Sequence, residues 1–233
     1  MQQITGILFD KDGTLFDFQA TWGAWAQSFL LEIAAGDRAR AAELGAAIGY
    51  RYEAETFEAD SPVIAGTPDE VAGLLLPLML GTRPAALVAT MNAAAARAPM
   101  REAAPLAPLM ARLSAMGLRL GVATNDAEAP ARAHLAAAGV EAHFDFIAGC
   151  DSGFGAKPAP GQLLAFAEAV ELAPQAVLMV GDSRHDLAAG RAAGMGTVAV
   201  LSGPARAGDL SDLADVILPD IGHLPGYLAA RAG

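Results

Sequence analysis

The chain has 233 residues, of which 54% are hydrophobic, and its formal net charge at pH 7 is −11. This length suits one large domain or a domain with a smaller insertion, and the negative charge disfavours nucleic acids and anionic membranes as partners. A single cysteine excludes an internal disulfide, and the sequence has neither a secretory signal nor an apolar run of about 18 residues, so we expect a cytoplasmic protein.

The first predicted element is a buried strand over residues 4–9, which runs directly into Asp10, Lys11, Asp12 and Gly13. Alternate residues of an extended chain point to the same side, so the two carboxylates would repel each other unless a cation lies between them. One carboxylate could attack phosphorus while the other transfers a proton. Gly13 lets the chain turn and lets backbone amides approach an anion. The segment therefore predicts a phosphoryl-transfer site.

The interval from Asp17 to Arg101 contains no convincing strand and predicts a helical insertion. Trp22, Trp25 and Phe29 fall near helical spacing, and Thr67 begins a capping box. Further helices are expected over residues 37–48, 68–80 and 84–96, with a loop over 49–66. We expect a catalytic core of residues 1–16 and 102–233, interrupted by a helical cap domain of residues 17–101.

From about residue 105 onward, short apolar strands alternate with helices. These strands are expected at residues 118–123, 144–148, 176–180, 197–201 and 214–218. Their continuous apolar character is typical of strands covered on both faces, and right-handed crossovers would make the sheet parallel. The pattern predicts an α/β fold in which a doubly wound parallel sheet of modified Rossmann type carries an inserted, all-helical cap.

In open α/β sheets, ligands bind beyond the carboxyl ends of the strands. Thr124 and Asn125 follow one strand and offer a hydroxyl and an amide to a phosphate oxygen, whereas Asp182 and Asp186 follow another and suit a hard cation. Lys157 precedes a helix whose N-terminus favours anions. Of 15 basic residues only Lys11 and Lys157 are lysines, and both lie within these segments, where a compact ammonium suits a phosphate or a bridging carboxylate.

Together these segments resemble the haloacid dehalogenase superfamily of phosphohydrolases. The resemblance rests on Asp-x-Asp-Gly-Thr at residues 10–14, then Thr124, then Lys157-Pro158, then Gly181-Asp182-x-x-x-Asp186, in that order on successive strands. The helical cap resembles that of phosphoglycolate phosphatases. One departure is Phe18, which follows Asp17 where many relatives have serine.

The resemblance implies a Mg²⁺-dependent phosphomonoester hydrolase. Asp10 would be the nucleophile that forms an aspartyl-phosphate, and Asp12 the general acid and then the general base. The metal ligands would be the carboxylates of Asp10 and Asp182 and the backbone carbonyl of Asp12, while Asp186 would either approach the metal or orient Lys157. Thr124, Asn125 and Lys157 would bind the phosphoryl group, with amides near Lys11 assisting.

The expected substrate is a small phosphorylated metabolite, with phosphoglycolate the leading candidate. In the cap loop, Arg51 could meet a second anionic group of the substrate or could be an ordinary solvated arginine. Arg184 and His185 are expected to face solvent. The remaining histidines lack ligand spacing and are expected at the surface or in packing roles: His134, His143 and His223.

Three alternatives stay open from the sequence. A phosphosugar mutase would use the same aspartyl-phosphate. A signalling receiver, which is a non-catalytic phospho-acceptor, would also place aspartates, a threonine and a lysine around Mg²⁺, although on a smaller chain. A binding protein could keep the fold without turnover. The sequence also leaves open whether the protein is a monomer or a homodimer.

Overall fold

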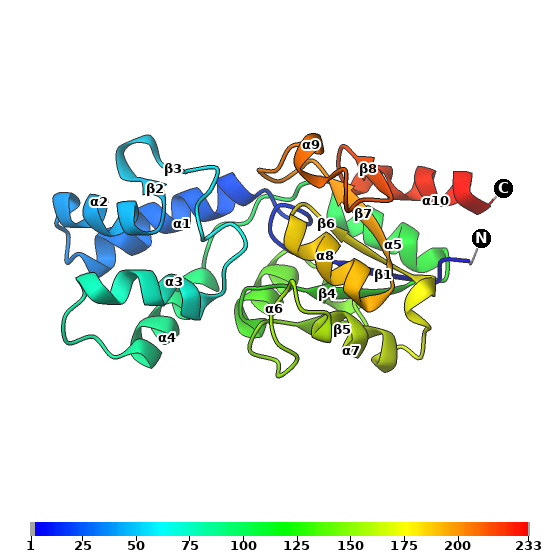
Figure 1. Cartoon of the computed structure of the whole chain (residues 1–233), viewed down its shortest axis with the longest axis horizontal. Helices are drawn as coiled ribbons and strands as arrows, with labels where there is room; N and C mark the ends of the chain where they lie inside the picture. Colours follow the sequence, from blue (N-terminus) through cyan, green and yellow to red (C-terminus); the bar gives the residue numbers. More distant parts are fainter. Residues whose placement is uncertain (1–2, 233) are drawn as a thin grey trace.

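Six parallel strands form the central sheet of this protein, whose residues 3–232 are described by a computed structural model. Their order across the sheet is β5-β4-β1-β6-β7-β8 (Figure 1). The strands are β1 (Gly6–Phe9), β4 (Arg119–Ala123), β5 (Phe146–Ala148), β6 (Val177–Gly181), β7 (Gly196–Val200) and β8 (Val216–Leu218). Each matches a predicted strand to within two residues at either end. The predicted α/β fold is therefore confirmed.

Helices cover both faces of the sheet because strand side chains alternate between the faces. Ile7 and Phe9 pack with residues of α5, α6 and α10, whereas Leu8 packs with residues of α7 and α8. The helices of this part are α5 (Leu106–Ala115), α6 (Glu128–Ala137), α7 (Gly161–Ala169), α8 (Arg184–Ala193), α9 (Ala207–Leu210) and α10 (Leu224–Ala232). Within residues 3–232, no helix combines the length and the apolar character that crossing a bilayer requires.

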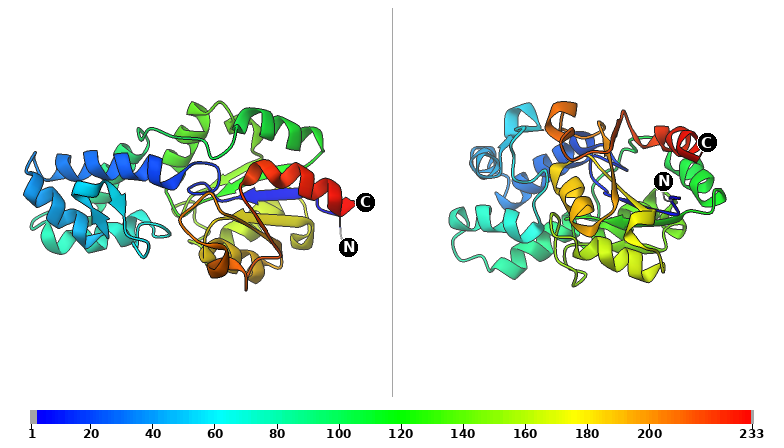
Figure 2. Two further views of the ribbon diagram at one scale, coloured as in Figure 1. Left: turned by 90° about the horizontal axis from the view of Figure 1, so that it is seen from above. Right: turned by 45° about the vertical axis from the view of Figure 1, so that its right-hand side comes forward.

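Between β1 and β4 the chain leaves the sheet and forms a separate group of helices (Figures 1 and 2). They are α1 (Phe18–Ile33), α2 (Arg38–Ala47), α3 (Pro68–Leu75) and α4 (Pro84–Ala95). Their buried apolar side chains form a cluster of their own, whose members all lie between Phe18 and Ala95. This separate cluster supports our proposal that residues 17–101 are a cap domain and that residues 1–16 and 102–233 are the core. Residues 1, 2 and 233 of that core lie outside the described chain.

Two predictions for the insertion were wrong in detail. Instead of a loop alone, residues 49–66 contain an antiparallel hairpin of β2 (Tyr50–Arg51) and β3 (Thr56–Phe57). Strands of two residues are too short to create a readable alternating pattern. In addition, α3 ends at Leu75 rather than near residue 80, because Pro77 has no N–H for the next helical turn. The predicted capping box of Thr67 is present.

Candidate active site

Polar side chains from four loops meet at the carboxyl edge of the sheet. Asp10 follows β1, Thr124 follows β4 and Asp182 follows β6, and these three strands are neighbours in the sheet. Lys157 reaches the same place from the loop between β5 and α7. A solvent-open cleft lies here and is lined by residues of both the sheet edge and the helical insertion. The topology therefore unites segments that are far apart in sequence.

Three buried carboxylates share one ammonium at the base of the cleft. Asp10, Asp182 and Asp186 each contribute a carboxylate oxygen, and these oxygens lie within 4.8 Å of one another. The Nζ of Lys157 lies 2.6 Å from Asp10 Oδ1 and 2.7 Å from Asp186 Oδ1, and it also donates to the carbonyl of Ala123 at 2.7 Å. One positive charge therefore faces three acids, which leaves an excess of negative charge.

The pKa values of these groups follow from burial and from this imbalance. Burial raises the pKa of Asp10 to about 7, against the lowering effect of Lys157 and with the further repulsion of Asp186 and Asp12. Burial and the charges of Asp10 and Asp186 raise the pKa of Asp182 well above its usual value. Burial alone would lower the pKa of Lys157, but Asp10 and Asp186 outweigh it and raise the pKa. A bound cation would relieve this repulsion.

The residues present fit a hard divalent cation such as Mg²⁺. Hard cations bind carboxylate oxygens, and three of these converge in a buried site. Asp12 is not part of that cluster, because its side chain pairs with Lys11 at 2.8 Å, so its expected role as a ligand rests on its backbone carbonyl. Asp186 binds Lys157 through Oδ1 and accepts hydrogen bonds from Ser183 through Oδ2. These contacts support an orienting role for Asp186 toward Lys157.

Close backbone packing holds Asp182 in place. Gly13 has a φ of +82°, which favours glycine, and a Cβ at this position would lie 2.4 Å from Asp182 Oδ2. A Cβ on Gly203 would also overlap the same carboxylate. The loops after β1 and β7 therefore leave room for the Asp182 carboxylate only because both of these positions are glycine.

Thr124 and Asn125, the two predicted phosphate-binding residues of the second motif, have different surroundings. Thr124 is buried and lines the cleft, and its Oγ1 accepts from the amide of Asp126 at 3.1 Å, so its O–H can still donate to a ligand. The side-chain amide of Asn125 binds the carbonyls of Ala65 and Lys157 and accepts from the Lys157 amide. Because its side chain is engaged, a contribution of Asn125 to phosphate binding rests on its backbone.

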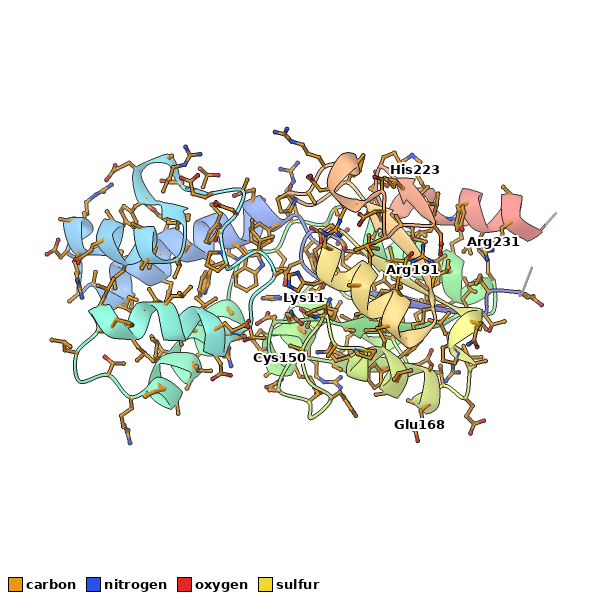
Figure 3. The ribbon with its side chains drawn as sticks, viewed as in Figure 1. Lys11, Cys150, Glu168, Arg191, His223 and Arg231 are labelled. Atoms are coloured by element: carbon orange, nitrogen blue, oxygen red, sulfur yellow. The ribbon has the colours of Figure 1, made fainter. Side chains whose placement is uncertain are left out.

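Lys11 is fully buried at the junction of the core and the insertion (Figure 3). Its Nζ lies 2.8 Å from Asp12 Oδ1, 3.1 Å from Asp126 Oδ2 and 3.2 Å from His134 Nδ1. Its ammonium also lies 5.1 Å from the ring centre of Trp22 in α1. The ammonium therefore joins Asp12 to two core segments and to the first helix of the insertion.

His134 extends this network because its two ring nitrogens have different partners. An ammonium can only donate, so Nδ1 accepts from Lys11, and the ring proton belongs on Nε2, which lies 2.8 Å from the carbonyl of Ala95 in α4. Burial and the Lys11 charge lower the pKa of His134 to about 4, which keeps the ring neutral at pH 7. The histidine thus links the buried lysine to the last turn of α4.

Replacing Lys11 by methionine should lower the free energy of unfolding by about 3–5 kcal/mol, because Asp12 and Asp126 would lose the cation between them. Urea unfolding at pH 7 measures this change. The matched control is Arg38→Met: Arg38 also pairs with a carboxylate and lies over a ring, that of Tyr52, but its side chain is 66% exposed, so we expect a loss below about 1 kcal/mol. Equal losses in the two variants would contradict the importance of the buried network.

Arg51, the cap residue that could have contacted the substrate, lies away from the cleft. Its side chain is 60% exposed and pairs with Glu58 at 3.2 Å. The geometry therefore gives no support to a substrate contact of Arg51. The cleft is lined instead by residues 63–67, at the end of the predicted loop and the start of α3. Helical spacing in α1 indicated its buried face, but no local signal indicated that the loop over 63–67 reaches the sheet edge.

The histidines and Arg184 divide between packing and surface positions. His134 is buried and His223 is exposed on the core, away from the junction with the insertion (Figure 3). His143 is half-buried and lies 3.4 Å from Ser114 Oγ. Arg184 is exposed and binds Asp212, as expected for a solvent-facing residue. His185 is also exposed, but it lines the mouth of the cleft, which the sequence did not indicate.

Comparison with known proteins gives consistent matches. A family model described as haloacid dehalogenase-like hydrolase matches residues 4–194. The phosphoglycolate phosphatase of Rhodospirillum rubrum is 36% identical over 120 residues, which are 52% of this chain and 50% of that protein. The phosphoglycolate phosphatase of Escherichia coli (strain K12) is 37% identical over 121 residues, 51% of this chain and 48% of that protein. The matches thus span about half the length of these curated relatives.

Among solved structures, the fold resembles a crystal structure described as a predicted phosphoglycolate phosphatase from Haemophilus somnus 129pt. The TM-score is 0.75 at 20% sequence identity, and the alignment covers 97% of this chain and 99% of that one. At this identity the likeness concerns the fold, including both the sheet and the helical insertion.

Proposed function

Because this chain belongs to the haloacid dehalogenase-like hydrolase family, we propose that it is a Mg²⁺-dependent phosphatase that hydrolyses a small phosphate monoester through a phosphorylated Asp10. The observation that supports this most strongly is the convergence of Asp10, Asp182 and Asp186 around Lys157 in a buried cleft. Phosphoryl transfer depends mainly on positioning and on neutralising the charge of the phosphoryl oxygens; this cluster offers the positioning, and a cation held by its carboxylates would supply the neutralising charge.

In the first proposed step, a carboxylate oxygen of Asp10 forms a bond to phosphorus while the bond from phosphorus to the ester oxygen breaks. Asp12 gives a proton to that departing oxygen, so that a neutral alcohol leaves. In the second step, water attacks the phosphorus, Asp12 takes up a proton from this water, and the bond to Asp10 breaks. Inorganic phosphate is released, and both aspartates return to their starting states.

The surrounding residues support these roles by position and charge. Lys157, 2.6 Å from Asp10 Oδ1, stabilises the ionised nucleophile, and the Thr124 hydroxyl can donate to a phosphoryl oxygen. Lys11, 2.8 Å from Asp12 Oδ1, holds the acid at the cleft. The carboxylates of Asp10 and Asp182 and the backbone carbonyl of Asp12 would hold Mg²⁺ beside Asp186, and the metal when bound supplies positive charge against the phosphoryl oxygens.

Phosphate release from a panel of small esters, measured with Mg²⁺ and with a chelator, tests the proposal. We expect release only with Mg²⁺, and recovery when excess Mg²⁺ follows the chelator. Absence of release from every ester by a folded protein would contradict a hydrolase and would favour a mutase or a non-catalytic binder. The curated relatives' names make phosphoglycolate the first ester to include.

A further inference from the structure

The part of the cleft contributed by the insertion has a distinctly apolar lining. Most of its lining side chains are aromatic or aliphatic, and they come from α1, the loop before α3, α3 itself and α4. They are Phe18, Trp22, Trp25, Val63, Ile64, Val71 and Met91. Trp22 and Trp25 pack edge to face, with ring centres 5.2 Å apart, and Trp25 stacks on Phe29 at 4.8 Å, so the aromatic part of this wall is rigid.

Positive charge is scarce in the same cleft. Among the described residues that line it, only Lys157 and His185 can carry a positive charge, whereas five aspartates line it: Asp10, Asp12, Asp126, Asp182 and Asp186. The three donors of Lys157 already meet Asp10, Asp186 and the Ala123 carbonyl. Arg184 lines a neighbouring outer groove and is bound to Asp212. Arg206 lines that groove as well. Within the cleft itself, a second anionic group on the substrate would meet five carboxylates and, as a cation beyond Lys157, only His185 among the described lining residues.

Polar groups are few on the wall that the insertion contributes to the cleft. Two uncharged polar side chains line the wall from the insertion, Thr67 and Asn92. The Thr67 hydroxyl is engaged with Glu70 in the cap of α3, so the amide of Asn92 is the better placed to bind a hydroxyl or carbonyl oxygen.

We infer that the alcohol released from the substrate is uncharged and has a ring-sized apolar face, rather than a second carboxylate or phosphate. This inference rests on the proposed function, because it concerns the leaving group of the same reaction. An apolar leaving group gains from burial against the aromatic wall, whereas a carboxylate would lose its hydration beside five acids and would have only His185 as a partner for an ion pair. The inferred substrate differs from phosphoglycolate, the leading candidate from the sequence and the substrate in the names of the curated relatives.

Three alkyl esters of phosphate test the inference with the wild-type protein and Mg²⁺. Phosphoglycolate and its amide differ only in the charge of the leaving group, and benzyl phosphate adds the apolar ring. We expect kcat/KM to be highest for benzyl phosphate and at least about tenfold lower for phosphoglycolate than for its amide. A higher kcat/KM for phosphoglycolate than for the amide and benzyl phosphate would overturn the inference.

A binding measurement separates this inference from the proposed function. The Asp10→Asn variant should not turn the esters over, so calorimetry with Mg²⁺ can give the Kd of each intact ester. Tighter binding of benzyl phosphate than of phosphoglycolate would support an apolar leaving group. If the wild type hydrolysed no ester, only the phosphatase proposal would be overturned, and this binding result would still stand. Tighter binding of phosphoglycolate would overturn the inference, whatever the turnover.

A charge placed in the wall provides the converse test. Asn92 is half-buried in α4 and lines the cleft, so Asn92→Arg would bring a cation to a leaving-group carboxylate. We expect the ratio of kcat/KM for phosphoglycolate to that for benzyl phosphate to rise about tenfold. The control Asn92→Met introduces a long side chain without a charge, so this ratio should stay unchanged or fall. If Asn92→Arg left the ratio unchanged, the lack of a cation in this wall would not explain a preference for uncharged leaving groups.

Discussion

Asp10→Asn is expected to lower kcat for phosphate esters by about 10⁴-fold or more, because an amide oxygen is a far weaker nucleophile than a carboxylate. The side chain lies at the end of β1, 2.6 Å from Lys157, and asparagine keeps its shape and one acceptor for that contact. Steady-state phosphate release with Mg²⁺ measures the loss. Turnover within about tenfold of the wild type would assign the nucleophile to another residue.

The same variant should be more stable than the wild type at pH 8 without metal. The folded protein raises the pKa of Asp10 from 3.8 to about 7, mainly through burial, so the folded state binds this proton more tightly than the unfolded state does. The contribution of the Asp10 carboxyl group to the free energy of unfolding is therefore lost as pH rises from about 4 to 7. Asparagine does not ionise, so we expect a gain on the order of 2 kcal/mol at pH 8, which shrinks toward pH 5.

Urea unfolding in chelator at the two pH values measures this gain. The control is Asp69→Asn, which changes an exposed acid in the first turn of α3. It should alter the free energy of unfolding by no more than about 0.5 kcal/mol at either pH and leave turnover intact. If Asp10→Asn destabilised the protein at pH 8, the contact with Lys157 would outweigh burial as the dominant effect on Asp10.

Lys157→Met is expected to abolish turnover and to lower the free energy of unfolding by about 3–5 kcal/mol at pH 8 without metal. Its ammonium is the only cation that contacts Asp10 and Asp186 among the described residues, and it is nearly fully buried. Methionine fills similar space but leaves these carboxylates facing each other and Asp182. The loss should shrink at lower pH, as the carboxylates take up protons, and on addition of Mg²⁺.

Arg191→Met is the matched control for this change. Arg191 lies 2.6 Å from Asp215, the same separation as between Lys157 and Asp10, but its side chain is 45% exposed. We expect a loss below about 1 kcal/mol and unchanged turnover. Two results would contradict the balance of charges that we describe at the base of the cleft. One is a loss of stability in Lys157→Met no larger than that in Arg191→Met, and the other is a loss that does not depend on pH.

The strands and the order of the motifs were predictable from the sequence because both depend on local pattern. Short apolar runs separated by helical periodicity indicated all six strands of the parallel sheet, and a parallel sheet brings the carboxyl ends of neighbouring strands together. The loops that carry Asp10, Thr124 and Asp182 could therefore be assigned to one edge before any coordinates were considered. The capping box of Thr67 was predictable for the same reason, since a cap is formed within four residues.

What depends on contacts between distant segments was decided only by the tertiary structure. The sequence indicated that Lys11 belongs to a motif, but not that Asp126 and His134 would meet its ammonium. It drew attention to Arg51, whereas folding turns Arg51 toward Glu58 and brings residues 63–67 into the cleft. Local pattern determines which residues form a helix or strand, but the character of a pocket depends on which side chains from separate elements come to face one another.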